Sequence, residues 1–448
     1  MKTRKLFPLL MSMALPNILS MLINSLYNIV DSFFVARISE KAMSAISIVF
    51  PIQNLSLSVA VGMGIGVNAA IALLMGRGDR KKAGFAGTLG MILFLVHGLL
   101  ALVLCTGILP GFLKLYTEDP EVLSMGVKYG TLVFLFAPVQ HLYIGTEKIY
   151  QSLGRMKTTM VCMSFGCIVN IILDPILIFG LGPVPPMGIA GAAWATGIGM
   201  TLELMLYGIL YRLQPISISL FRISGKPEGD ILKKIYGVGI PASLNMALPS
   251  LLISALNSIL MGFSSMYIVI LGAYYKLQTF VYMPVNGLIQ GLRPLVGYNF
   301  GAGAYGRVRK LYGLALGVTT VMMAAGTCVC FLMPETLMGM FADHPETIAQ
   351  GAKALKIIAL GFLASGISCT GCGCMEGLGM GIAPLSISLL RYTVPIIPAA
   401  WLFGRLAGPM GVFHAFWVTE LITACAALLI FRRSLKARIE EVSEMGTA

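Results

Sequence analysis

The sequence predicts an all-α protein that crosses a membrane twelve times, as two parallel repeats of six helices. The first observation is composition: 57% of the 448 residues are hydrophobic and 11% are charged, whereas soluble domains average about 25% charged residues. The mean hydropathy of +0.85 excludes a soluble enzyme. It also excludes a disordered scaffold, because disorder requires low hydrophobicity and high charge. The other two observations are the lengths of the apolar stretches and an internal repeat.

Twelve apolar stretches are long enough to cross a hydrocarbon core of about 30 Å at 1.5 Å per residue. Strands of an outer-membrane barrel are excluded, because they take about 10 residues and alternate apolar with polar side chains. We therefore expect membrane helices at residues 11–36, 43–75, 85–112, 126–152, 157–181, 188–211, 235–262, 266–300, 311–333, 349–375, 380–404 and 408–431.

The basic residues lie at alternating ends of these stretches. One side holds 22 of the 32 Lys and Arg residues, including those at both termini, and the other side holds seven. Lys and Arg are enriched in cytoplasmic loops, so we expect both termini in the cytoplasm. The clusters are small and separated by apolar runs, so the net charge of +13 predicts a lipid bilayer rather than nucleic acid as the partner.

The sequence repeats itself at an offset of about 225 residues, which divides the twelve spans into two halves of six. An even number of spans makes the repeats parallel. We expect an N-lobe at 1–211, a cytoplasmic linker at 212–234, a C-lobe at 235–432 and a cytoplasmic tail at 433–448. Two similar bundles suit alternating access, although a channel or an inert scaffold has the same symmetry. The matched pairs are Pro16 with Pro241, Gly62 with Gly287, Gly66 with Gly291, and Gly154 with Gly379.

Polar residues in the first half form a candidate ion site. An ionisable side chain in a span costs at least about 2.5 kcal/mol, so it normally faces a cavity, a partner or an ion path. Asp31 and Asp174 lie roughly 8 to 12 Å below the outer helix ends at 1.5 Å per residue, level with Thr196. Asn170 is four residues from Asp174 and shares its helix face. We expect Pro175 to disfavour the helix at Asp174 and free a nearby carbonyl group.

These residues suit cation exchange. Two carboxylates in a low-dielectric site cannot both ionise cheaply, so the site can hold a proton. It can also hold Na⁺, with oxygen ligands from Asp31, Asn170, Asp174 and Thr196; we expect no other metal and no cofactor. The alternative is a hydrogen-bonded pair that only locks the first and fifth helices together.

The second half lacks these acids, because Asn170 and Asp174 correspond to Pro395 and Ala399. We therefore expect cation coupling in the N-lobe alone. The second half instead has three charged residues near mid-depth, Lys276, Arg391 and Glu420. They are either a salt-bridge cluster that satisfies itself or a charge network that contacts substrate. Glu147, Glu203, Arg293 and Glu376 are nearer the cytoplasmic ends, where we expect snorkelling or gate pairing.

Six motifs resemble those of the multidrug and toxic compound extrusion (MATE) family, in the family's order and over nearly the whole chain. They are LYNIVDSFFV at 26–35, GRGD at 76–79, NIILDP at 170–175, GIAGAAWAT at 188–196, YKLQTF at 275–280 and YNFGAG at 298–303.

The resemblance implies a V-shaped, two-lobed, monomeric transporter in a bacterial inner membrane. It implies export of amphipathic, often cationic organic compounds in exchange for H⁺ or Na⁺, and the family's N-lobe cation set covers Asp31, Asn170, Asp174 and Thr196. The rivals are a lipid-linked oligosaccharide flippase of the same superfamily, usually with 14 spans and a basic cavity, and a passive channel or scaffold. ATP-driven transport and hydrolase chemistry have no support, because the sequence contains no Walker A, HExxH or GxSxG motif.

Overall fold

The computed structural model describes residues 3–220 and 229–445, and of residues 441–445 it describes the backbone alone. Lys2 and residues 221–228 of the expected linker, including Arg222 and Lys226, lie outside the described residues. The described chain is almost entirely helical, which confirms the all-α prediction. Apart from the helices, one isolated bridge pairs Leu181 with Val184.

Within the described residues, the first half of the chain contains seven helices: α1 (Leu6–Ala36), α2 (Glu40–Gly76), α3 (Arg80–Lys114), α4 (Pro120–Leu135), α5 (Ala137–Ser152), α6 (Met156–Phe179) and α7 (Ile189–Leu213). The second half contains eight: α8 (Gly229–Met261), α9 (Ser265–Gly301), α10 (Tyr305–Leu332), α11 (Pro334–Gly339), α12 (Pro345–Ala359), α13 (Phe362–Gly377), α14 (Ile382–Tyr392) and α15 (Ile396–Met445).

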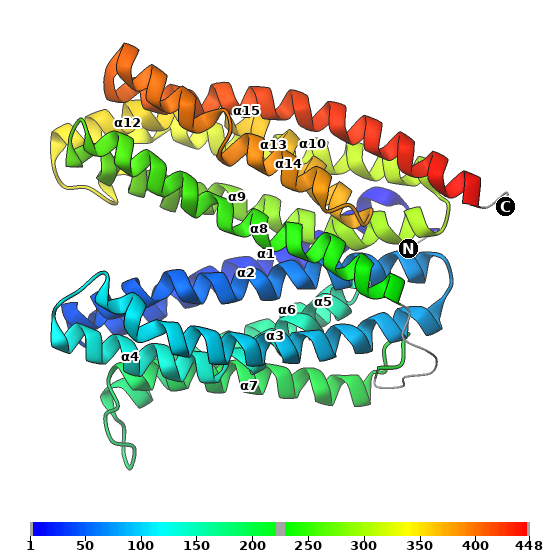
Figure 1. Ribbon diagram of the computed structural model, residues 1–448, viewed down its shortest axis with the longest axis horizontal. Coiled ribbons are helices and arrows are strands. Elements are labelled where there is room, and N and C mark those ends of the chain that lie inside the picture. Colours follow the sequence, from blue (N-terminus) through cyan, green and yellow to red (C-terminus); the bar gives the residue numbers. More distant parts are fainter. Residues whose placement is uncertain (1–2, 221–228, 446–448) are drawn as a thin grey trace. The chain divides into compact units, whose positions relative to one another are not determined.

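The described helices account for the twelve expected spans. Nine stretches pass the length and apolarity requirements alone, and the bent pairs α4/α5 (46°) and α12/α13 (50°) each supply one more. One of the nine, Ile382–Glu440, has 59 residues, far more than the roughly 20 that one crossing needs. Its helix is interrupted at Ala407 and Gly408, where the φ of Gly408 is +67°, and the chain reverses direction there (Figure 1). This stretch therefore supplies two spans.

The chain divides into two compact units. One comprises Leu19–Ser243, and the other comprises Met1–Ile18 together with Leu244–Ala448. The boundaries between the units fall inside α1 and α8, whereas the lobes expected from the sequence begin at residues 1 and 235. The N-terminal half of α1 is thus part of the unit that contains the second half of the chain.

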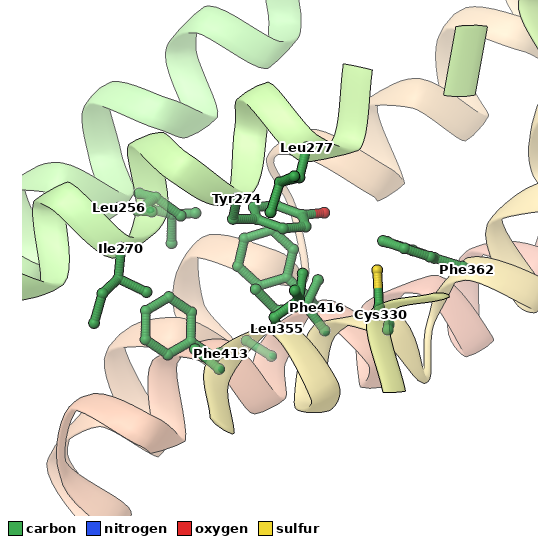
Figure 2. Close-up of a cluster of buried hydrophobic side chains, with 14 of the residues drawn as sticks. Leu256, Ile270, Tyr274, Leu277, Cys330, Leu355, Phe362, Phe413 and Phe416 are labelled. Carbon is green, nitrogen blue, oxygen red and sulfur yellow. The ribbon is translucent and has the colours of Figure 1, made fainter. Parts of the chain in front are cut away.

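The unit that contains α9 to α15 has an aromatic and aliphatic core (Figure 2). Tyr274 on α9 packs edge-to-face on Phe416 of α15, with ring centroids 5.3 Å apart. Leu355 from α12 and Phe362 from α13 are buried in the same cluster. These buried rings hold the helices in fixed register, because aromatic pairs prefer such edge-to-face contacts.

In the other unit, glycine allows α3 and α5 to pack closely. A Cβ atom at Gly145 would lie 2.1 Å from Cδ2 of Phe94, and Phe94 is itself buried. We expect Gly145→Ala to destabilise the protein by about 1 to 3 kcal/mol, as overpacking of a tight core does. Thermal unfolding in detergent measures the effect. Gly107→Ala on α3 is the control, because a Cβ there meets nothing within 4 Å, and equal stability of the two variants would contradict the prediction.

Candidate cation-coupling site

Three helices carry the four residues expected to form the site: Asp31 on α1, Asn170 and Asp174 on α6, and Thr196 on α7. The structure corrects the expectation for Pro175, because α6 continues through it to Phe179. Proline removes one backbone donor. The missing N–H of Pro175 leaves one carbonyl group without its helical partner. Because Pro175 is close to the end of α6, the final turn of the helix still forms.

Glycines bring α6 and α7 close enough for their polar side chains to meet. A Cβ atom at Gly199 would lie 3.0 Å from the Gly166 carbonyl oxygen and 3.3 Å from Cβ of Asn170. Asn170 and Thr196 consequently touch across this interface. The structure thus brings together residues that are 26 positions apart in the sequence.

The amide group of Asn170 links Thr196 to Asp174. In the orientation that pairs each donor with an acceptor, its Oδ1 accepts from the backbone N of Thr196 at 2.9 Å and from Oγ1 of Thr196 at 3.2 Å. Its Nδ2 then donates to Oδ2 of Asp174 at 2.9 Å. The amide oxygen is therefore occupied, and the nitrogen faces the carboxyl group.

Asp174 is fully buried, and its Oδ1 has no hydrogen-bond donor among the described residues. The side chain of Asp31 lies within hydrogen-bonding reach of Asp174. Two carboxyl groups can form such a bond only when one of them carries a proton, because an ionised carboxylate is solely an acceptor. The geometry around Asp174 Oδ1 therefore suits one shared proton.

Asp31 differs from Asp174 in being only partly buried. It lines a cavity of about 260 Å³ together with residues of α1 and α2. Asp31 is therefore the more accessible member of the pair. The other lining residues are Ser32, Val35, Met43, Ile46, Ser47 and Phe50.

Two tyrosines that the sequence analysis missed adjoin the pair. The hydroxyl group of Tyr27 hydrogen-bonds to Thr196 and interacts electrostatically with Asp31. Tyr129 on α4 is buried and interacts with both Asp31 and Asp174. A signal for Tyr27 was present, because it lies four residues before Asp31 and thus on the same helix face. Nothing in the sequence placed Tyr129 there.

The three charged residues of the second half do not form one cluster. Arg391 and Glu420 form a buried ion pair, with Nη2 and Oε1 2.7 Å apart. Lys276 does not join this pair: it is exposed, and its Nζ lies 5.6 Å from the ring centroid of Phe341. Arg391 also donates to the hydroxyl group of Tyr282 at 3.0 Å and to Sγ of Cys369 at 3.0 Å.

The acids expected near the cytoplasmic ends behave differently from one another. Glu376 forms an ion pair with Arg293, with Oε2 and Nη2 2.7 Å apart. Glu203 neither snorkels nor pairs: the residue is 6% exposed, and its Oε1 has no hydrogen-bond partner among the described residues. The expectation of snorkelling is wrong for Glu203, because its side chain packs against α6 rather than extending along α7.

Comparisons with known proteins agree on one family. A family model described as MatE matches residues 16–176 and 241–402, well over half of the chain. The multidrug export protein MepA of Staphylococcus saprophyticus is 27% identical over 423 residues, covering 94% of this chain and 92% of the relative. MepA of Staphylococcus aureus is 25% identical over 425 residues, covering 95% and 93%.

Solved structures show the same fold. An outward-facing multidrug resistance MATE family transporter of the MOP superfamily superposes with a TM-score of 0.90. The match covers 98% of this chain and all of that one, at 20% sequence identity. A MATE structure in the bent conformation gives a TM-score of 0.91 over 99% of this chain and all of that one, at 21% identity. The twelve-helix, two-lobed fold expected from the sequence is therefore confirmed.

Proposed function

Since the chain belongs to the multidrug and toxic compound extrusion family of membrane transporters, we propose that it is a proton-coupled antiporter. It exports amphipathic, often cationic organic compounds by alternating access and is not an enzyme. The curated relatives named as multidrug export proteins support export of this substrate class. The coupling residues are Asp31, Asn170, Asp174 and Thr196.

The observation that carries the proton assignment is the arrangement around Asp174. Its buried Oδ1 has no donor among the described residues, and the Asp31 carboxyl group is adjacent. One proton between the two carboxyl groups satisfies both. Na⁺ would need oxygen ligands. In the Asn170 amide orientation that pairs every donor with an acceptor when no ion is bound, the oxygen accepts from Thr196 and the nitrogen faces Asp174. Na⁺ would require the opposite amide orientation, whereas a shared proton is compatible with this one.

We place the transporter in a bacterial inner membrane as a monomer, with both termini in the cytoplasm. The positive-inside asymmetry of 22 against seven basic residues supports this orientation. The bacterial relatives support the location. The partners are then the lipid bilayer and small organic substrates.

The test is transport by the purified protein in liposomes, with a pH gradient and a Na⁺ gradient imposed separately. The probe is ethidium, a planar fluorescent cation, and each gradient is imposed in both directions because reconstituted molecules face both ways. We expect the pH gradient alone to drive ethidium against its own gradient. Uphill movement driven only by Na⁺ would refute the proton assignment. Only downhill movement would indicate a channel, and no ethidium movement together with flipping of a lipid-linked oligosaccharide would indicate a flippase.

A further inference from the structure

A second buried carboxyl group lies deeper in the same unit as the Asp31/Asp174 pair. Glu203 is seven residues, and therefore about 10 Å, further along α7 than Thr196. Seven residues are close to two full turns, so Glu203 lies on the same face of α7 as Thr196. The face that forms the coupling site thus carries an acid two turns closer to the Leu213 end.

Contact with α6 fixes the position of the Glu203 carboxyl group. A Cβ atom at Gly166 would lie 2.8 Å from Oε2 of Glu203, and Gly166 is one turn from Asn170 on α6. The contact between Gly166 and Glu203 therefore lies in the same α6–α7 interface as the contact between Asn170 and Thr196, one turn away along α6 and two turns away along α7. Both depend on glycines that let the two helices approach.

Among the described residues, no cation acts on Glu203, and the charged group that does is Glu147. The ammonium group of Lys148 on α5 binds Oε1 of Glu147 at 3.2 Å and Oε1 of Gln151 at 3.1 Å. Oε1 of Glu203 remains without a hydrogen-bond partner in the described part of the unit. A buried carboxylate without a cation is costly, and protonation removes that cost. The titratable groups that interact with Glu203 are Tyr143 and Glu147 from α5, Cys162 and Cys167 from α6, and Tyr207 from α7 itself.

Tyrosine hydroxyl groups lie near both the coupling site and Glu203. Tyr27 hydrogen-bonds to Thr196. Tyr143 on α5 is close enough to interact electrostatically with Tyr27, Glu147 and Glu203. A hydroxyl group can accept one proton and donate another, which is the property that proton transfer between the two levels requires.

We propose that Glu203 is a second proton-binding site, which receives the proton that leaves the Asp31/Asp174 pair and passes it toward the Leu213 end of α7. The proposal rests on the proton coupling proposed above. The proton moves from the carboxyl pair to the Glu203 carboxylate, which becomes a neutral acid. It then leaves toward the cluster of Glu147, Lys148 and Gln151 and returns Glu203 to the ionised form.

The first test measures proton binding directly. Infrared difference spectra of the full-length protein, taken across a pH series, record the C=O stretching band of each carboxyl group that becomes protonated. We expect Glu203→Gln to lose one band that Asp174→Asn retains. Glu335→Gln is the control, because Glu335 is exposed on α11 and its loss should leave that band unchanged. A Glu203→Gln spectrum identical to that of the unaltered protein would overturn the proposal.

The second test keeps the Glu203 carboxyl group and compares a variant that displaces it with a control variant that does not. Gly166→Ala places a methyl group against Oε2 of Glu203 and should shift the pH midpoint of the Glu203 band. Gly208→Ala on α7 meets nothing within 4 Å and should leave the midpoint unchanged. Equal midpoints in the two variants would overturn the proposal, even if Glu203→Gln does not fold.

Transport separates this proposal from the coupling proposal. In liposomes with a pH gradient, Glu203→Gln should slow export of ethidium while its equilibrium binding of ethidium stays unchanged. Export at the unaltered rate would overturn the proposal that the proton passes through Glu203. Failure of the coupling proposal has a different signature: Asp174→Asn would continue to pump, while the Glu203 band would remain in the infrared spectra.

Discussion

Replacing Asp31 by Asn is expected to lower export driven by a pH gradient by about a hundredfold or more, the scale of losing a positioned proton-transfer group. The amide keeps the shape of the carboxyl group, and its NH₂ can donate to the orphaned Oδ1 of Asp174, so the protein should still fold. It cannot take up and release a proton. The measurement is accumulation of ethidium in liposomes at matched protein density.

Ser32→Ala is the matched control for Asp31→Asn. Ser32 is the next residue of α1 and lines the same cavity, but its hydroxyl group bonds to the backbone carbonyl of Asn28 and cannot cycle a charge. We expect nearly normal export from this variant. If Asp31→Asn pumps as fast as Ser32→Ala, the proton does not pass through this pair.

Replacing Arg391 by Met is expected to destabilise the protein by about 3 to 5 kcal/mol, because removing one partner of a buried ion pair leaves an uncompensated charge. The Glu420 carboxyl group would lose its ion-pair partner, and its Oε2 already has no hydrogen-bond partner in the described structure. The hydroxyl group of Tyr282 would also lose the guanidinium group that donates to it. The measurement is the midpoint of thermal unfolding in detergent.

Two further variants make this prediction specific. The double variant Arg391→Met/Glu420→Gln should recover part of the lost stability, because it also removes the uncompensated charge of Glu420. Lys436→Met is the control: Lys436 forms an exposed pair with Glu440 at 3.8 Å, and such pairs contribute about 0 to 1 kcal/mol. A stable Arg391→Met variant with an altered range of substrates would instead assign the pair to substrate contact.

The structure reduces the three mid-depth charges of the second half to one ion pair and a separate lysine. Lys276, Arg391 and Glu420 lie at similar depths in their spans, but depth does not specify the direction in which a side chain points around its helix. Arg391 and Glu420 face each other because α14 and α15 pack together. Lys276 lies on an exposed face of α9, over the ring of Phe341.

The sequence by itself determined the class and the number of spans, and it singled out the four residues of the proposed coupling site. A helix must have about 20 apolar residues to cross a bilayer, and an acid inside such a stretch requires a reason to be there. Both constraints act on single segments, so Asp31 and Asp174 could be recognised before any packing was known.

Only the tertiary structure decided which atoms of those residues contact one another and which other residues adjoin them. The orientation of the Asn170 amide depends on Thr196 across the helix interface, and the contribution of Tyr129 depends on how α4 packs beside the site. Whether Glu203 snorkels or stays buried depends on Gly166, which lets α7 approach α6 until the carboxyl group is enclosed. The physical reason is common to all three: hydropathy sets the depth of each residue, but close packing between helices sets which atoms meet and which polar atoms are left without a partner.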